Sequence, residues 1–196
     1  MLAPWPAVAA VNVSLTPTDT RRALKVAGET DAARTKFHAP YVITVKHQVV
    51  RVLEVLTEFR RTVTAAENAR RRGDWAVAQG AHSLDGRGVE DTVKPWRGKV
   101  TITATLQFDP LHTYVTVPNC EVMMGGMPVL ASLERRTNPL SSLPYSSRGV
   151  TTTALVGATI EADFDAAAVG ETSRSAVVMC EGRDLVRVDI DFSQIQ

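Results

Sequence analysis

The sequence predicts an α+β protein in which short helices and one principal helix precede an antiparallel β-sandwich-like body. The first observation is the spacing of apolar residues, which is helical over about 57–72 and alternates at every second residue in several stretches of about 96–196. The second is the recurrence of turn signals in the C-terminal half, which separate short runs with one apolar face. We expect a single domain, 1–196, in which a mixed helix and strand part, 1–95, packs on the β-rich part.

The principal helix is expected to begin after Thr57, which is a favourable N-cap residue. Glu58 then places a negative charge in the first turn, where free backbone N–H groups stabilise it. Phe59 opens an apolar stripe at three- and four-residue spacing. The arginines at 70–72 and Gly73 are typical of a helix end, so the pattern predicts a complete helix.

The residues before this helix fit two structures. The valines of 49–56 are β-branched and favour a strand, whereas the same apolar stripe also suits one helix over about 48–72. We favour the strand and expect another over 41–45. Short helices are expected over 18–28 and 31–37.

The remainder is expected to alternate between strands and loops. A helical turn is expected over 74–79, and the polar segments 79–95 and 138–149, which contain Gly, Pro or Ser, are expected to be loops. Glu181-Gly182 begins a hairpin signal. We expect strands over 100–108, 113–117, 121–124, 156–164, 176–180 and 186–192.

Composition narrows the function classes. Hydrophobic content is 44% and the formal charge is +1, as in an ordinary globular protein. With only 6% aromatic residues, the basic face of the principal helix is expected to be solvated rather than to bind nucleic acid. No apolar run approaches the roughly 20 residues of a membrane span, and no nucleotide-binding motif occurs, so no cofactor is expected. The apolar stretch 2–11 fits a signal-peptide remnant or an edge strand, which leaves open whether Met1 is the mature start.

The two cysteines, Cys120 and Cys180, have two interpretations. In an oxidising compartment they could pair and close a loop of about 60 residues. Alternatively, they are two buried free thiols, which the apolar run around Cys180 favours.

Catalytic chemistry has only dispersed candidates. His38, His47, His82 and Asp85 could meet in the fold, but no pair of histidines has the spacing of a metal or catalytic motif. His112 is the remaining histidine. Surface or structural histidines are the alternative interpretation.

Two acidic pairs are candidate cation ligands. Asp163 and Asp165 alternate on one strand, as do Asp189 and Asp191, so each pair shares a face. If the two strands were neighbours, four carboxylates could bind a hard cation such as calcium. Because no calcium-loop pattern is present, we favour a solvated polar face and expect no metal.

Four segments resemble those of an uncharacterised bacterial protein family of extracytoplasmic location. They are FHAPYVITV, VLEVLTEFRRTVTAAE, PWRGKVTI and LVGATIEADFDAAAVG, and the resemblance spans most of 36–192. None is a catalytic signature. The resemblance implies a periplasmic or secreted location and no particular activity.

We therefore expect a non-enzymatic, extracytoplasmic binding or protein-interaction domain whose partner is a protein or a small molecule. The long loops 79–95 and 138–149 could form its recognition edge. One alternative is a hydrolase-type or metal-dependent enzyme built from the dispersed His and Asp residues. Another is a subunit that assembles through its sheet edges, which an exposed and unprotected edge strand would favour.

Overall fold

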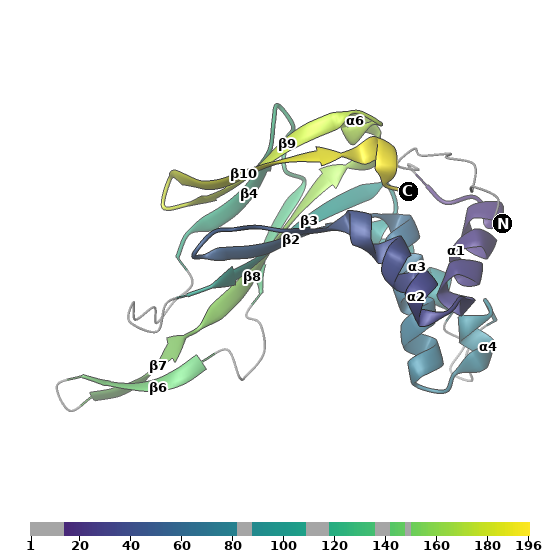
Figure 1. Cartoon of the computed structure of the whole chain (residues 1–196), viewed down its shortest axis with the longest axis horizontal. Coiled ribbons are helices and arrows are strands. Elements are labelled where there is room, and N and C mark those ends of the chain that lie inside the picture. The colour runs from purple at the N-terminus through teal and green to yellow at the C-terminus, as the bar shows by residue number, and fades with distance from the viewer. Residues whose placement is uncertain (1–13, 82–87, 109–117, 136–141, 148–149) are drawn as a thin grey trace.

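The chain folds into a helical part at one end of two stacked antiparallel sheets (Figure 1). This computed structural model describes all residues except 1–13, 82–87, 109–117, 136–141 and 148–149. The fold is α+β, as the sequence predicts, and the two sheets fit a sandwich-like body. In the described residues no helix has the length and apolar character needed to cross a membrane.

The helical part is organised around the principal helix, α3. Phe59, Val63 and Ala66 of α3 are buried against Ala23 and Val26 of α1 in a core separate from that of the sheets. Its helices are α1 Pro17–Gly28, α2 Asp31–His38, α3 Glu58–Arg71, α4 Trp75–Ala78 and α5 Val89–Val93, with 3-10 turns at Ala39–Tyr41 and Lys94–Trp96.

Local capping explains where the two longest helices begin. The Thr57 hydroxyl accepts a hydrogen bond from the Arg60 backbone N–H at 3.2 Å, which confirms the predicted start of α3. Helix α1 begins slightly earlier than expected. Thr16, not a threonine inside the segment 18–28, is its N-cap, and Thr16 and Asp19 form a reciprocal capping box.

The larger sheet has five strands in the order β1-β2-β3-β8-β5, and every neighbouring pair is antiparallel. The smaller sheet has the order β10-β9-β4, and β6 and β7 form a separate hairpin. The strands are β1 Val42–Thr44, β2 Val50–Leu56, β3 Lys99–Gln107, β4 Cys120–Met124, β5 Ala131–Arg135, β6 Ser142–Ser147, β7 Val150–Leu155, β8 Gly157–Asp165, β9 Ser173–Cys180 and β10 Arg183–Asp191. The segment 49–56 is therefore a strand and not part of a longer helix.

The sandwich core lies between the apolar faces of the two sheets. Ile102 and Phe164 of the larger sheet belong to the same buried cluster as Val122, Val178 and Ile190 of the smaller one. The sheets approach most closely where β4 packs over β3 and β8. Among the described elements, no comparable packing joins β10 to β1 or β2. The sheets are thus closest on the β4 side of the sandwich, and we call the β10 side, where apolar residues of the core remain partly exposed, its open side.

Three expectations need correction. The segment expected to be a loop over 79–95 contains α5, because the Asp91 carboxylate accepts the Gly88 N–H at 2.9 Å and Val89 and Val93 bury one face. The segment 138–149, also expected to be a loop, contains β6, which pairs along its backbone with β7. The expected strand 113–117 lies outside the described residues.

The third correction concerns the two faces of β3. Alternation predicts that its threonines face water, yet Thr101 and Thr103 are buried. The Thr101 hydroxyl accepts a hydrogen bond from Arg61 of α3 at 2.8 Å and donates one to Asp163 at 2.7 Å. The helical part therefore covers the start of this polar face.

The hairpin signal at Glu181-Gly182 is confirmed, because both residues have positive φ and join β9 to β10.

Candidate functional site

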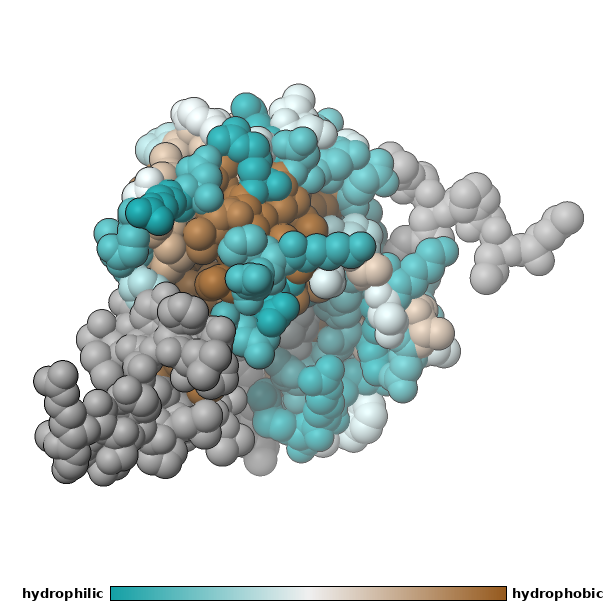
Figure 2. Space-filling model, turned by 60° about the vertical axis from the view of Figure 1, so that its left-hand side comes forward, coloured by the Kyte–Doolittle hydropathy of each residue, from teal (hydrophilic) through white to brown (hydrophobic). Residues whose placement is uncertain are grey.

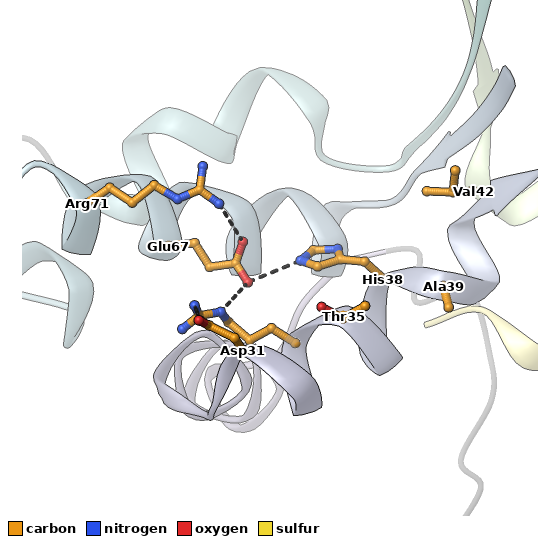
Figure 3. Close-up of a pocket in the computed structure, with 8 residues that line it drawn as sticks. Asp31, Thr35, His38, Ala39, Val42, Glu67 and Arg71 are labelled. Carbon is orange, nitrogen blue, oxygen red and sulfur yellow. Dashed lines mark hydrogen bonds and ion pairs between the residues drawn. The ribbon is translucent and has the colours of Figure 1, made fainter. Parts of the chain in front are cut away.

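A hollow in the helical part surrounds the buried carboxylate of Glu67 (Figure 3). Glu67 lies on the face of α3 that meets α2, and its side chain is 7% exposed. Its Oε1 atom is 3.1 Å from Nε2 of His38 and 3.5 Å from Nε of Arg34, and its Oε2 atom is 3.9 Å from Nη2 of Arg71. The hollow has a volume of about 480 Å³ and is lined by Asp31, Arg34, Thr35, His38, Ala39, Val42, Glu67 and Arg71.

The bonding of this cluster is structural in character. Arg34 also donates to the Glu29 carbonyl at 3.0 Å and pairs with Asp31, so its guanidinium joins both ends of the turn between α1 and α2 to α3. Nε2 of His38 is held by Glu67, and Nδ1 is buried without a hydrogen-bond partner in the described part of the chain. A general base must reach its substrate proton. Neither ring nitrogen of His38 is presented to the hollow in that way.

The structure does not bring together the two predicted catalytic residues that it describes, His38 and His47. His47 lies in the connection between β1 and β2, where its Nδ1 accepts the backbone N–H groups of Val49 and Val50 at 3.1 and 3.2 Å. It is not among the residues around the Glu67 hollow. His82, Asp85 and His112 lie outside the described residues.

The two acidic pairs do not form one surface, so the four-carboxylate arrangement is wrong. Asp163 and Asp165 lie on β8 of the larger sheet, whereas Asp189 and Asp191 lie on β10 of the smaller one. Asp163 is buried rather than solvated and accepts the Thr101 hydroxyl. Within the described ranges, no group of three or more His, Cys, Asp or Glu side chains could hold a metal ion.

Two further carboxylates of these pairs, those of Asp165 and Asp191, cap local turns. Asp165 accepts the Ala167 N–H at 2.8 Å and begins the short helix α6, Ala166–Val169. Asp191 accepts both the backbone N–H and the hydroxyl of Ser193, at 3.0 and 2.6 Å. These bonds explain both side chains without a ligand.

The arginines of α3 are not a uniformly solvated face. Arg60 is buried and donates to the Val55 carbonyl at 2.8 Å, and burial lowers the pKa of its guanidinium. Arg61 stacks on the Trp96 ring, with its guanidinium carbon 3.8 Å from the ring centroid. Arg70 donates to the Ala27 carbonyl at 2.6 Å. These arginines join α3 to its neighbours.

A second, smaller pocket lies where α3 begins, among residues that no sequence pattern singles out. Burial raises the pKa of Glu58, whose Oε1 is 3.6 Å from Nε of Arg97. Its Oε2 is buried and has no hydrogen-bond partner in the described part of the chain. The pocket has a volume of about 150 Å³ and is lined by Leu15, Pro17, Thr20, Glu58, Thr62, Glu90, Val93 and Arg97. The sequence signal was a glutamate directly after an N-cap, which is ordinary at a helix start.

The two cysteines meet in the smaller sheet. Cys120 of β4 and Cys180 of β9 are directly opposed partners of the antiparallel ladder, and a disulfide joins them. The bond therefore fixes β4 to β9 at the end of the sheet where the β9–β10 hairpin turns.

The open side of the sandwich exposes apolar surface. Six residues that pack against the sandwich core are only partly buried there: Ile43, Val45, Val49, Leu185, Val186 and Val188. The first three belong to the β1–β2 hairpin, and the last three belong to β10. Figure 2 shows an apolar surface of this kind framed by hydrophilic side chains. We name these six residues the apolar opening.

Comparison of the chain with protein-family models, curated proteins and solved structures finds no match. Any functional conclusion therefore depends on the geometry of the chain itself.

Proposed function

We propose that this protein is a non-enzymatic, extracytoplasmic binding domain that holds an apolar partner segment at the apolar opening. The observation that carries the proposal is the position of that opening between two edge strands, β1 and β10. Each edge strand pairs with one neighbour among the described strands. An edge strand offers backbone hydrogen bonds, and neighbouring apolar side chains offer specificity, which together favour an extended protein segment as partner.

Two further observations support this proposal over an enzyme. The polar hollow around Glu67 is explained by bonds between its own side chains. The two described histidines lie apart, each with a local structural partner. The disulfide between Cys120 and Cys180 supports an oxidising, extracytoplasmic compartment, because cytosolic thiols are usually kept reduced.

Binding at the apolar opening is tested with a hydrophobic dye, anilinonaphthalene sulfonate. We expect saturable binding to the folded wild type. Val45→Lys places a charge in the opening and should weaken binding several-fold. Thr44→Lys, at the neighbouring exposed residue of the β1–β2 hairpin, should bind as the wild type does. If Val45→Lys does not fold, Val49→Lys gives the same test. A folded wild type without saturable binding would overturn the proposal.

The compartment is tested separately. Cells of the natural host are treated with a thiol-alkylating reagent before lysis, and the mass of the protein is measured. We expect no added alkyl group on Cys120 or Cys180 unless the sample is first reduced. Alkylation of both residues without reduction would contradict an oxidising location.

A further inference from the structure

Strand β10 is the longest edge strand of the two sheets. It has nine residues, Arg183–Asp191, whereas the other edge strands are Val42–Thr44, Ala131–Arg135 and Cys120–Met124. A register shift interrupts β10 only between Asp184 and Val186, near its turn, and the strand contains neither lysine nor proline. Proteins commonly use these devices to protect edge strands from pairing. The stretch 186–191 is thus a regular edge without bulge, lysine or proline, and its charged residues are Arg187, Asp189 and Asp191.

Backbone geometry shows which groups of this edge face outwards. The Ser175 carbonyl accepts the Gly125 N–H at 3.0 Å on the β4 side of β9. In an antiparallel ladder Ser175 is therefore not hydrogen-bonded to its partner on the other side, Asp189. The N–H and C=O groups of Asp189, and of Arg187 two residues earlier, consequently point away from β9. They are the groups available to another strand.

The side chains of the same residues carry complementary charges. Arg187 and Asp189 are exposed on the outer face of β10, whereas Val188 between them faces the sandwich interior. A strand that carries the order Arg-Val-Asp is self-complementary when a second copy runs antiparallel to it.

We propose that two copies of this chain associate through β10, antiparallel, about a two-fold axis at Val188. Arg187 then lies opposite Asp189 of the second copy, and Asp189 lies opposite Arg187 of that copy. Both pairs join residues with outward backbone groups, so each is a hydrogen-bonded pair of the new ladder. Val188 meets its own copy on the inner face. The smaller sheets would form one six-stranded sheet.

Charge selects this register over its neighbours. A shift by two residues in one direction places Arg187 opposite Arg187. A shift in the other direction pairs Arg187 with Asp191 but places Asp189 opposite Asp189, so the register centred on Val188 is the one that forms two Arg–Asp pairs with no like-charge contact. Like charges directly opposite each other destabilise a sheet. Within one chain, Nη2 of Arg187 is 3.2 Å from Oδ2 of Asp184. Both side chains are largely exposed, and such surface ion pairs contribute little to stability. The ion pair to Asp184 therefore does not prevent the intermolecular one.

This inference rests on the proposed function, because it names a second copy of the chain as a partner at the open side. It also goes beyond that proposal by fixing the strand, the direction and the register. The two proposals fail differently. Dye binding is measured at concentrations at which the chain is monomeric, so its absence there would contradict the apolar opening. A chain that binds dye and stays monomeric at its highest soluble concentration would contradict the β10 pairing.

The test is sedimentation velocity of the full chain and its charge variants over a range of concentrations. We expect the wild type to form a dimer. Either Arg187→Asp alone or Asp189→Arg alone places like charges opposite each other in both pairs. Each variant should therefore raise the dissociation constant of the dimer at least about tenfold. An equimolar mixture of the two variants restores both opposite-charge pairs, so it should form a heterodimer.

Arg183→Asp is the matched control, because it makes the same charge change on β10 outside the two pairs and should leave the dimer unchanged. A wild type that stays monomeric at its highest soluble concentration would overturn the proposal. So would a mixture of the two single variants that fails to associate while both variants are folded by circular dichroism. A dimer unaffected by either charge reversal would place the interface elsewhere and overturn it as well.

Discussion

Cys120 and Cys180 are directly opposed across β4 and β9, and their bond crosses 60 residues of sequence. A cross-link over this separation restricts the unfolded chain and stabilises the fold by about 4 kcal/mol in the chain-entropy treatment. We expect reduction to lower the free energy of unfolding by about 2–5 kcal/mol. Denaturant titration with and without reductant measures the difference.

The double variant Cys120→Ser/Cys180→Ser is the control for reduction. It should unfold at the lower denaturant concentration whether or not reductant is present. Equal midpoints for the oxidised wild type and this variant would show that the bond does not stabilise the fold.

Glu67 holds α2 against α3, so we expect its charge to matter more than that of an exposed partner. Glu67→Gln removes the negative charge beside Arg34 and His38 and should lower the free energy of unfolding by about 1–3 kcal/mol. Asp31→Asn is the matched control, because Asp31 also pairs with Arg34 but is 93% exposed. This substitution should lower the free energy of unfolding by less than about 0.5 kcal/mol. Chemical denaturation of both variants tests the contrast, and equal costs would contradict a structural role for Glu67.

The elements that local chemistry determines were predictable from the sequence. Thr57 caps α3 through its own hydroxyl, and the β-branched residues of 49–56 form β2. Helix α5 was missed because its two buried valines, Val89 and Val93, stand within a polar and glycine-containing segment. Five residues are too few for a helical period to stand out.

The candidate sites depend on contacts between distant residues. In the sequence, Glu67 has the pattern of an ordinary carboxylate on a helix face. In the fold, α2 places His38, 29 residues earlier in the chain, beside it. Similarly, the alternation of apolar and polar residues in this part of the sequence predicts that Asp163 faces solvent. Its burial follows from strand order, because β3 pairs with β8 and places Thr101 next to it. Strand order depends on pairing between distant segments, and the pattern of apolar and polar residues along one strand does not reveal it.

Glu58 should make stability depend on pH. Burial raises the pKa of Glu58 in the folded state above its ordinary value of 4.5. The stability contributed by its protonated form is therefore fully present below pH 4.5. This contribution is lost as the pH rises through the folded-state pKa. Glu58→Gln is neutral at every pH and should therefore gain stability relative to the wild type as the pH rises above 4.5. Urea unfolding across that range tests this, with Glu90→Gln, an exposed carboxylate of the same pocket, as control.

Tyr41 joins the helical part to the last residues of the chain and should titrate late. Its hydroxyl donates to the Gln196 carbonyl at 3.2 Å and accepts the Gln196 N–H at 3.1 Å, and burial raises its pKa to about 12. The unfolded chain releases this proton near pH 10, so the stability contributed by the neutral phenol is complete below pH 10 and is lost as the pH rises through 12.

We therefore expect the free energy of unfolding of the wild type to fall between pH 10 and pH 12 more steeply than that of Tyr41→Phe, by up to about 1.4 kcal/mol per pH unit. At neutral pH the variant should be less stable by about 1 kcal/mol, because the Gln196 N–H loses its acceptor while the Gln196 carbonyl keeps the Thr57 hydroxyl. Lysine titration affects both proteins equally and cancels in the difference. Parallel stability curves over this range would mean that the Tyr41 hydroxyl is open to solvent, which its 2% exposure contradicts.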